Sequence, residues 1–270
     1  MSAIATVPSP SVAAATKAPR SMPGWVPGAV GIGGLLILWQ ILGMTVFKHS
    51  GVVPPPTKIL SSMGDDGWKF YGPNIKTTVR EAGVGWLWGN SLAIIMAIAF
   101  VQIPLVERAL LRLAVASYCL PVIAIGPILA ILFSGDTPKV ILAALSVFFT
   151  TLIGALVGLR SADKTSLEVI QAYGGGSWTQ LRKVRIKSSL PSLFAGLRIA
   201  APAAMLGAII GEYMGGESGL GVSMINSQQG LHIARTWGIA LAATAVAGIG
   251  YGLTALVGRL LTPWAPGGRK

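Results

Sequence analysis

The chain has 270 residues, of which 53% are hydrophobic and only 11% are charged, and its formal net charge is +12 at pH 7. Soluble domains average about 25% charged residues, so this chain lacks the polar residues needed to cover a surface that faces water. Its apolar content also excludes intrinsic disorder for most of its length. Because a membrane-spanning helix takes about 20 residues, the length allows about six of them. We therefore expect an all-α, polytopic membrane protein with six transmembrane helices.

The N-terminal region changes composition sharply near residue 25. Residues 1–24 are rich in Ala, Ser, Pro and Thr, and no basic stretch followed by an apolar run marks a cleavable signal peptide. We predict a disordered tail there. The apolar run 25–47 is the first predicted transmembrane helix. Three consecutive prolines at 54–56 cannot continue it, and residues 57–70 are predicted to form a short amphipathic helix or a loop.

Five further apolar runs predict the remaining spans, with boundaries good to a few residues. They cover 75–101, 109–133, 140–159, 193–210 and 237–260. Pro121 and Pro127 lie inside the 109–133 run, where each removes a backbone hydrogen bond and bends a helix. Such a bend either lines a transport pathway or only improves packing, and the sequence leaves both readings open.

The basic residues predict the orientation of the chain. With the N-terminus in the cytoplasm, thirteen Lys and Arg residues lie on the inner side, six lie on the outer side, and two fall within span ends. Basic residues concentrate in cytoplasmic loops, so both termini and the polar stretch 160–191 are predicted to be cytoplasmic. The net charge is then a topology signal, and we expect no nucleic-acid partner.

The polar stretch 160–191 has the composition of two short helices joined by a glycine bend. Thr165 or Ser166 can cap a helix, and Glu168 lies in its first turn, where the helix dipole favours a carboxylate. Gly174-Gly175-Gly176 stops that helix, and a basic second helix is predicted over 178–189. This shape suits docking into a groove of a cytoplasmic partner. A helix lying on lipid headgroups is the alternative.

The same stretch resembles a known motif. Glu168-Val-Ile-Gln-Ala-Tyr-Gly174, followed by Val184, Ile186 and Leu190-Pro191, is similar to the EAA loop of ABC importer permeases, although Val169 and Ile170 replace two alanines. Three other segments are similar to the permeases of nitrate, sulfonate and taurine importers: Leu120–Gly135, Thr77–Gly83 and Ser218–Gly221 with Glu212 before it. These resemblances cover about Pro54 to Pro263.

The resemblance implies a type I ABC importer permease, with a core permease domain at 75–262 and an EAA-type coupling loop at 160–191. It implies a transmembrane subunit of the bacterial inner (plasma) membrane that is not itself an enzyme and holds no cofactor, because ATP and Mg are bound by a partner ATPase. The implied partners are two ATP-binding cassette ATPase subunits, a second copy of the chain, an extracytoplasmic solute-binding protein and the lipid bilayer. The implied cargo is a small solute of the nitrate, sulfonate, taurine, bicarbonate or vitamin-precursor type.

The candidate site residues fall into two groups. The residues expected to couple to the ATPase are Glu168, Ala172, Tyr173, Gly174, Gly175 and Trp178. The candidates for the pathway or gate are Pro121, Pro127, Asn90, Glu212, Gly219 and Gly221. A carboxylate such as Glu212 is costly near hydrocarbon unless it is paired or hydrated, so it either holds the following loop or faces the pore.

Other classes of protein are disfavoured. The single Cys119 excludes an intrachain disulfide, no His, Cys or carboxylate cluster predicts a metal site, and no set of nucleophile and base is apparent. A stand-alone secondary transporter or channel is the alternative function, and it predicts carboxylates near the middle of the membrane. The predicted spans 109–133, 140–159 and 237–260 carry none at their centres.

Overall fold

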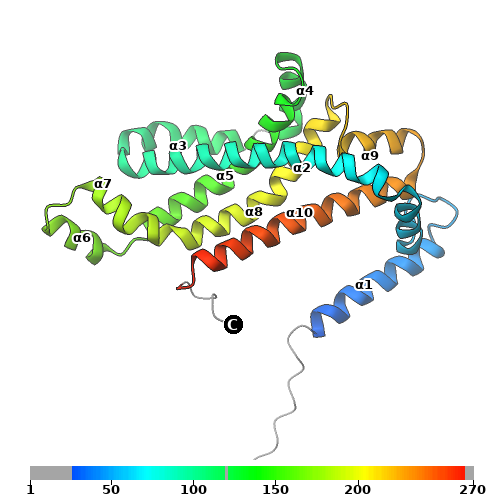
Figure 1. The fold of residues 1–270 in the computed structure, drawn as a ribbon, viewed down its shortest axis with the longest axis horizontal. Coiled ribbons are helices and arrows are strands. Elements are labelled where there is room, and N and C mark those ends of the chain that lie inside the picture. The colour runs from blue at the N-terminus through cyan, green and yellow to red at the C-terminus, as the bar shows by residue number, and fades with distance from the viewer. Residues whose placement is uncertain (1–25, 119–120, 265–270) are drawn as a thin grey trace, which may run out of the picture.

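The computed structural model describes residues 26–118 and 121–264, and every regular element within them is helical (Figure 1). The predicted N-terminal tail, residues 1–24, lies outside the described residues. The elements are α1 Val26–Met44, α2 Pro56–Gln102, α3 Pro104–Tyr118, α4 Val122–Leu132, α5 Thr137–Arg160, α6 Lys164–Ala172, α7 Ser177–Gln180, the π-helical turn η1 Leu181–Arg185, α8 Ile186–Tyr213, α9 Leu220–Gln229 and α10 Ile233–Leu261.

Five helical runs of the described chain are long and apolar enough to cross a membrane, and α4 is a shorter apolar helix. Helices α2 and α5 run parallel, because Gly85 faces Val140 and Asn90 bonds Thr151 further along both. The chain must therefore return between them, and α3 and α4 make that pass (Figure 1). The expected all-α fold with six passes agrees with this arrangement.

The third span differs from the prediction of one continuous helix over 109–133. Instead α3 ends at Tyr118, and α4 begins at Val122. Pro121 lies between them with extended backbone, φ −63° and ψ 114°, because proline has no amide hydrogen to donate within a helix and keeps its predecessor out of the α region. Pro127 is the proline that lies inside α4. At about 1.5 Å per residue, α4 spans only about half of a 30 Å hydrocarbon layer.

Two helices are longer than the apolar runs suggested. Helix α2 begins at Pro56 rather than at residue 75, and it bends at Gly67, whose φ is +63°. The helix expected to end at Ser189 continues without a break through α8, so the fifth span and the second helix of the 160–191 segment are one rod. In addition, the glycine-rich stretch before the last span contains the unpredicted helix α9.

Glycines set the helix contacts of the core. A Cβ atom at Gly85 would lie 2.8 Å from the carbonyl oxygen of Val140, and one at Gly207 would lie 2.7 Å from the Cα of Ala143. Helices α2 and α8 therefore both pack against α5 at backbone distance, and both approach Ala143, as small residues allow in membrane bundles. The corresponding pair on α10, Gly248 and Gly252, meets no atom within 4 Å in the described chain.

Candidate functional site

The 160–191 segment forms one end of the bundle, where α6 and α7 project beyond the long helices (Figure 1). Helix α6 begins after Asp163, whose carboxylate Oδ2 accepts a hydrogen bond from the backbone N–H of Ser166 at 2.9 Å. The prediction that Thr165 or Ser166 caps this helix is therefore wrong. An aspartate one turn earlier is the better cap, since its side chain reaches a free amide of the first turn. The hydrogen bonds that Asp163 accepts from Ser166, above all the one from its backbone N–H, hold the pKa of Asp163 below its usual value.

The glycine bend follows α6 as expected. Gly174 has φ +78°, a conformation that a residue with a Cβ adopts only at a cost. The backbone N–H of Gly175 bonds the carbonyl of Ile170 at 2.8 Å, and a Cβ on Gly175 would lie 2.9 Å from that same oxygen. Gly176 has an ordinary φ of −77°. The first two glycines of the run are thus required by the geometry of the turn.

The tip of this segment presents an apolar surface. Tyr173 is 89% exposed, Trp178 is 59% exposed and Val169 is 50% exposed, which is unusual for large apolar side chains outside a lipid or protein contact. Of the six residues predicted to couple to an ATPase, five are exposed at this tip and Gly175 is partly buried. The structure therefore gathers that group at one tip of the molecule.

The tip is anchored firmly to the bundle. Leu181 is 1% exposed and packs in a hydrophobic cluster with α2 and α5. The side-chain amide of Gln180 donates a hydrogen bond to the carbonyl oxygen of Leu167 at 3.1 Å, and the guanidinium of Arg185 donates one to the carbonyl oxygen of Leu159 at 3.2 Å. The helical run from Ser177 to Tyr213 connects this tip to the far end of α8.

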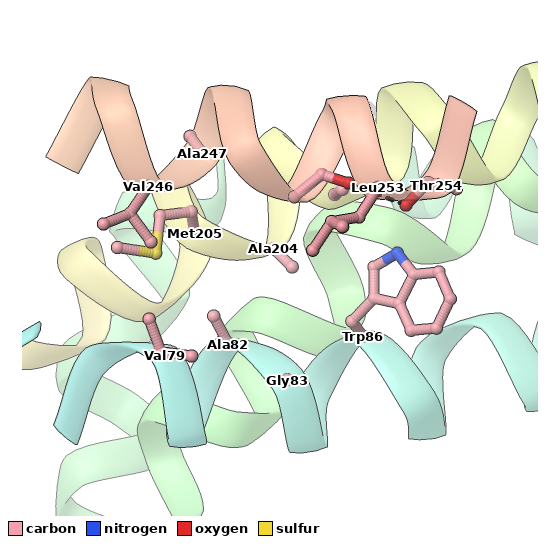
Figure 2. A pocket seen from close by; sticks show the side chains of 12 residues that line it. Val79, Ala82, Gly83, Trp86, Ala204, Met205, Val246, Ala247, Leu253 and Thr254 are labelled. Carbon is pink, nitrogen blue, oxygen red and sulfur yellow. Dashed lines mark hydrogen bonds between the residues drawn. The ribbon is translucent and has the colours of Figure 1, made fainter. Parts of the chain in front are cut away.

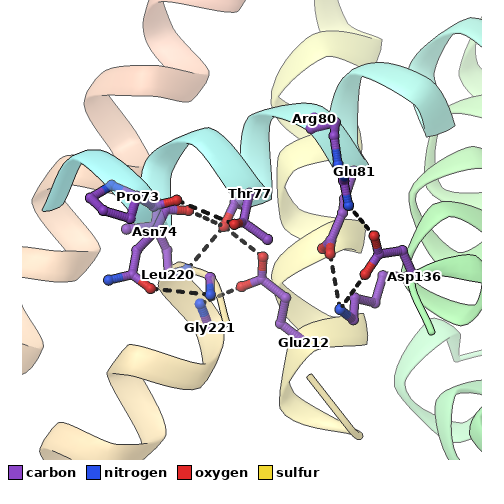
Figure 3. A network of polar contacts seen from close by, with 12 residues as sticks. Pro73, Asn74, Thr77, Arg80, Glu81, Asp136, Glu212, Leu220 and Gly221 are labelled. Carbon is purple, nitrogen blue, oxygen red and sulfur yellow. Dashed lines mark hydrogen bonds and ion pairs between the residues drawn. The ribbon is translucent and has the colours of Figure 1, made fainter. Parts of the chain in front are cut away.

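That far end carries a buried polar network built around Glu212, which is 1% exposed (Figure 3). Its Oε1 accepts a hydrogen bond from the hydroxyl of Thr78 on α2 at 2.6 Å, and its Oε2 accepts one from the backbone N–H of Gly221 at 2.5 Å. The Thr78 hydroxyl accepts from the N–H of Leu220 at 2.9 Å. Of the two roles open for Glu212, the structure shows that it holds the following loop.

Gly219 and Gly221, the two glycines among the pathway or gate candidates, belong to this network. Gly219 has φ +123°, and its N–H donates to Asn74 at 3.2 Å. A Cβ on Gly221 would lie 2.8 Å from the carboxylate of Glu212. The first glycine is thus needed for its backbone conformation and the second for the close approach of the carboxylate. The sequence indicated Glu212 and both glycines. It did not single out Asn74, or Thr78 within the Thr77–Gly83 segment, because uncharged polar residues on a long helix resemble any others.

Next to Glu212 lies a cluster of four charged residues (Figure 3). Lys139 on α5 bonds Glu81 on α2 at 2.9 Å and Asp136 at 3.0 Å, and Asp136 also pairs with Arg80. The side chains of Lys139 and Glu81 are 5% and 0% exposed. The hydrogen bond from Lys139 is the main cause that lowers the pKa of Asp136. This cluster ties α2 to the start of α5, where an unpaired buried charge would be costly.

The other pathway candidates lie elsewhere. Asn90 is 4% exposed and bonds Thr151 between α2 and α5. Pro121, just before α4, and Pro127, inside it, are both exposed. The structure therefore brings together Glu212 and the two glycines and leaves the other three apart. Within the described residues, no group of three or more His, Cys, Asp or Glu side chains could hold a metal ion.

Comparisons with known proteins support the membrane-transport interpretation of this fold. The family model described as binding-protein-dependent transport system inner membrane component matches residues 89–265. The chain is 31% identical to a riboflavin transport system permease of Chloroflexus aurantiacus over 85% of this chain and 87% of that protein. It is 29% identical to a formylaminopyrimidine transport permease of Halalkalibacterium halodurans, over 69% and 75% of the two chains. It is 25% identical to the taurine transport system permease of Escherichia coli, over 85% and 86%.

Proposed function

Because the chain belongs to the family of binding-protein-dependent transport system inner membrane components, we propose that two copies of it form the translocation pathway of an ATP-driven importer. Family membership makes it a multi-pass permease subunit of the inner membrane that serves a small solute. Our proposal adds its partners, its orientation and the coupling role of the 160–191 segment. ATP hydrolysis belongs to a separate ATPase in this proposal.

The observation that carries the coupling role is the exposed apolar tip on one continuous helical rod. Tyr173 and Trp178 present a surface that a partner protein can cover, and the helical run from Ser177 to Tyr213 is about 55 Å long at 1.5 Å per residue. When two ATPase subunits close on ATP, they draw the two tips together. The rods transmit this movement to the end that holds Glu212, and the pathway changes the side to which it opens.

The orientation follows from the basic residues. The 160–191 segment carries Arg182, Lys183, Arg185 and Lys187, and its first residue, Arg160, pairs with Glu107 on α3. A basic end of the bundle is expected to face the cytoplasm, where ATP is available. The opposite end, with α9 and the Glu212 network, then faces the solute-binding protein. The names of the relatives support a small organic solute or anion as cargo.

Reconstitution in liposomes tests this proposal. The chain, the ATPase and the solute-binding protein encoded beside it are placed in vesicles loaded with ATP and Mg, and uptake of the binding protein's ligand is measured. Uptake that requires both the ATPase and internal ATP supports the proposal. Ion-driven uptake by the chain alone would contradict it and favour the secondary transporter.

A further inference from the structure

An apolar groove of about 260 Å³ lies between α2 and α10, with α8 as its floor (Figure 2). The floor is made of small residues such as Ala201 and Ala204, and the walls include Val79 and Leu253, which are 42% and 58% exposed. The groove is therefore open along its side. Since all three helices are of membrane-spanning length and composition, its open side faces the hydrocarbon layer or another apolar chain.

One end of the groove has a hydrogen-bond donor without an acceptor within the described residues. The indole Nε1 of Trp86 is buried and has no partner within the described residues, and Figure 2 shows this nitrogen on the side of the ring toward α10. The hydroxyl of Thr254, also in the lining, donates its hydrogen bond to the carbonyl oxygen of Gly250 at 2.8 Å. A small hydrophilic solute would find too few polar groups here, whereas a hydrocarbon chain matches the lining.

Arg198 continues the same face of α8. It lies three residues before Ala201 and seven before Met205, spacings that place side chains on one side of a helix. Its guanidinium carbon lies 5.6 Å from the ring centroid of Tyr251 on α10. It forms no ion pair with any residue in the described part of the chain, and its Nε is buried without a hydrogen-bond partner. A cation within a membrane span normally pairs with a carboxylate or another acceptor.

From this combination we infer that the groove binds a phospholipid with an anionic headgroup. An acyl chain lies along the small residues of α8, and the phosphate oxygens accept hydrogen bonds from Arg198. Basic residues between transmembrane helices bind anionic headgroups in this way. None of the candidate pathway or gate residues, and no residue of the 160–191 segment, lines this groove. Lipid binding there would make the stability of the α2–α8–α10 packing depend on lipid charge.

The test measures lipid binding to the purified full-length chain by native mass spectrometry. Dioleoyl phosphatidylglycerol and dioleoyl phosphatidylcholine are compared at equal concentration, because they share acyl chains and differ in charge. We expect preferential binding of the first lipid. Arg198→Gln should weaken its binding about fivefold, the size of one basic contact to an anionic lipid, and should leave the second lipid unchanged. Arg198→Lys should retain most of the preference.

A matched pair of glycine variants tests the groove itself. A Cβ at Gly83, in the lining, and one at Gly248, outside it, both meet no atom within 4 Å, so both positions have room for a Cβ atom, and Gly83→Leu and Gly248→Leu form a matched pair whose melting temperatures are measured first. Gly83→Leu should reduce binding of both lipids, and Gly248→Leu should not. Equal binding of the two lipids to the unaltered chain, undiminished phosphatidylglycerol binding by Arg198→Gln, or equal behaviour of the two glycine variants would overturn the inference. A change of oligomeric state in Gly83→Leu with unchanged lipid binding would assign the groove to a second copy instead.

Discussion

Replacement of Glu212 by alanine should loosen the contact between α8, α9 and α2. The change removes the acceptor of the backbone N–H of Gly221, in a region that water does not reach. It also removes one of the two acceptors of the Thr78 hydroxyl, which keeps the carbonyl oxygen of Asn74 at 3.1 Å. Because one buried donor left without an acceptor costs about 1–3 kcal/mol, the variant should lose about 1–3 kcal/mol of unfolding free energy, a substantial part of the stability of an ordinary protein.

This loss is measured by thermal unfolding of the purified chain in detergent, with protease cleavage in the α8–α9 turn as the readout. Glu217 provides the control, because it lies in the same turn but is exposed, and Glu217→Ala should change stability by less than about 0.5 kcal/mol. In a double-mutant cycle with Thr78→Val, the two losses should fall short of additivity, since both remove the same hydrogen bond. Equal stability of the two glutamate variants would refute the structural role assigned to Glu212.

Three further predictions concern the two ends of the bundle. Gly174→Ala places a Cβ at φ +78°, which costs about 1–2 kcal/mol, and it should lower solute-stimulated ATP hydrolysis by the assembled complex. The control is Gly176→Ala, at φ −77°, and a complex with this variant should hydrolyse ATP at the normal rate. An equal effect of both changes would argue against the role of the bend. Lys139→Met leaves the carboxylate of Glu81 buried and unpaired, so the unfolding free energy should fall by about 3–5 kcal/mol, measured as a lower melting temperature. Adding Glu81→Gln to this variant should recover part of the lost stability, and no recovery would argue against the ion pair. Because hydrogen bonds hold the pKa of Asp163 below its usual value, its capping contribution is complete above about pH 4 and is lost as the pH falls through the lower pKa of the folded state. Hydrogen exchange of the α6 amides should thus be faster in Asp163→Ala than in the unaltered chain at pH 7, and the two should converge in strong acid; equal exchange at pH 7 would contradict the cap.

The apolar runs predicted the fold class because hydrocarbon accepts few backbone arrangements other than helices. Boundaries were weaker where polar residues continue a helix beyond the membrane. Helix α2 begins at Pro56, because neither Gly67, where it bends, nor Pro73 inside it ends the helix before the span. The break at Pro121 was visible as a proline, but whether a proline bends or ends a helix depends on the packing around it.

The site was predictable where local chemistry decides the structure. The glycine bend needs a positive φ at Gly174, and three consecutive glycines at 174–176 indicate such a turn directly in the sequence. The partners of Glu212 and Glu81 could not be predicted, since Thr78 and Lys139 are distant in the sequence and meet them only through the packing of α2, α5 and α8. The cap at Asp163 was missed because several residues around it are equally good caps by type.

Site-directed cross-linking tests the central claim most directly. In a background where Cys119 is replaced by serine, a cysteine at Tyr173 should form a cross-link with the ATPase subunit of the assembled complex, and the yield should change when ATP binds. A cysteine at Leu231, which is 80% exposed in the turn between α9 and α10, should form none. A cross-link to the ATPase from position 231, with none from position 173, would contradict this claim, because the opposite end of the bundle would then contact the ATPase subunit.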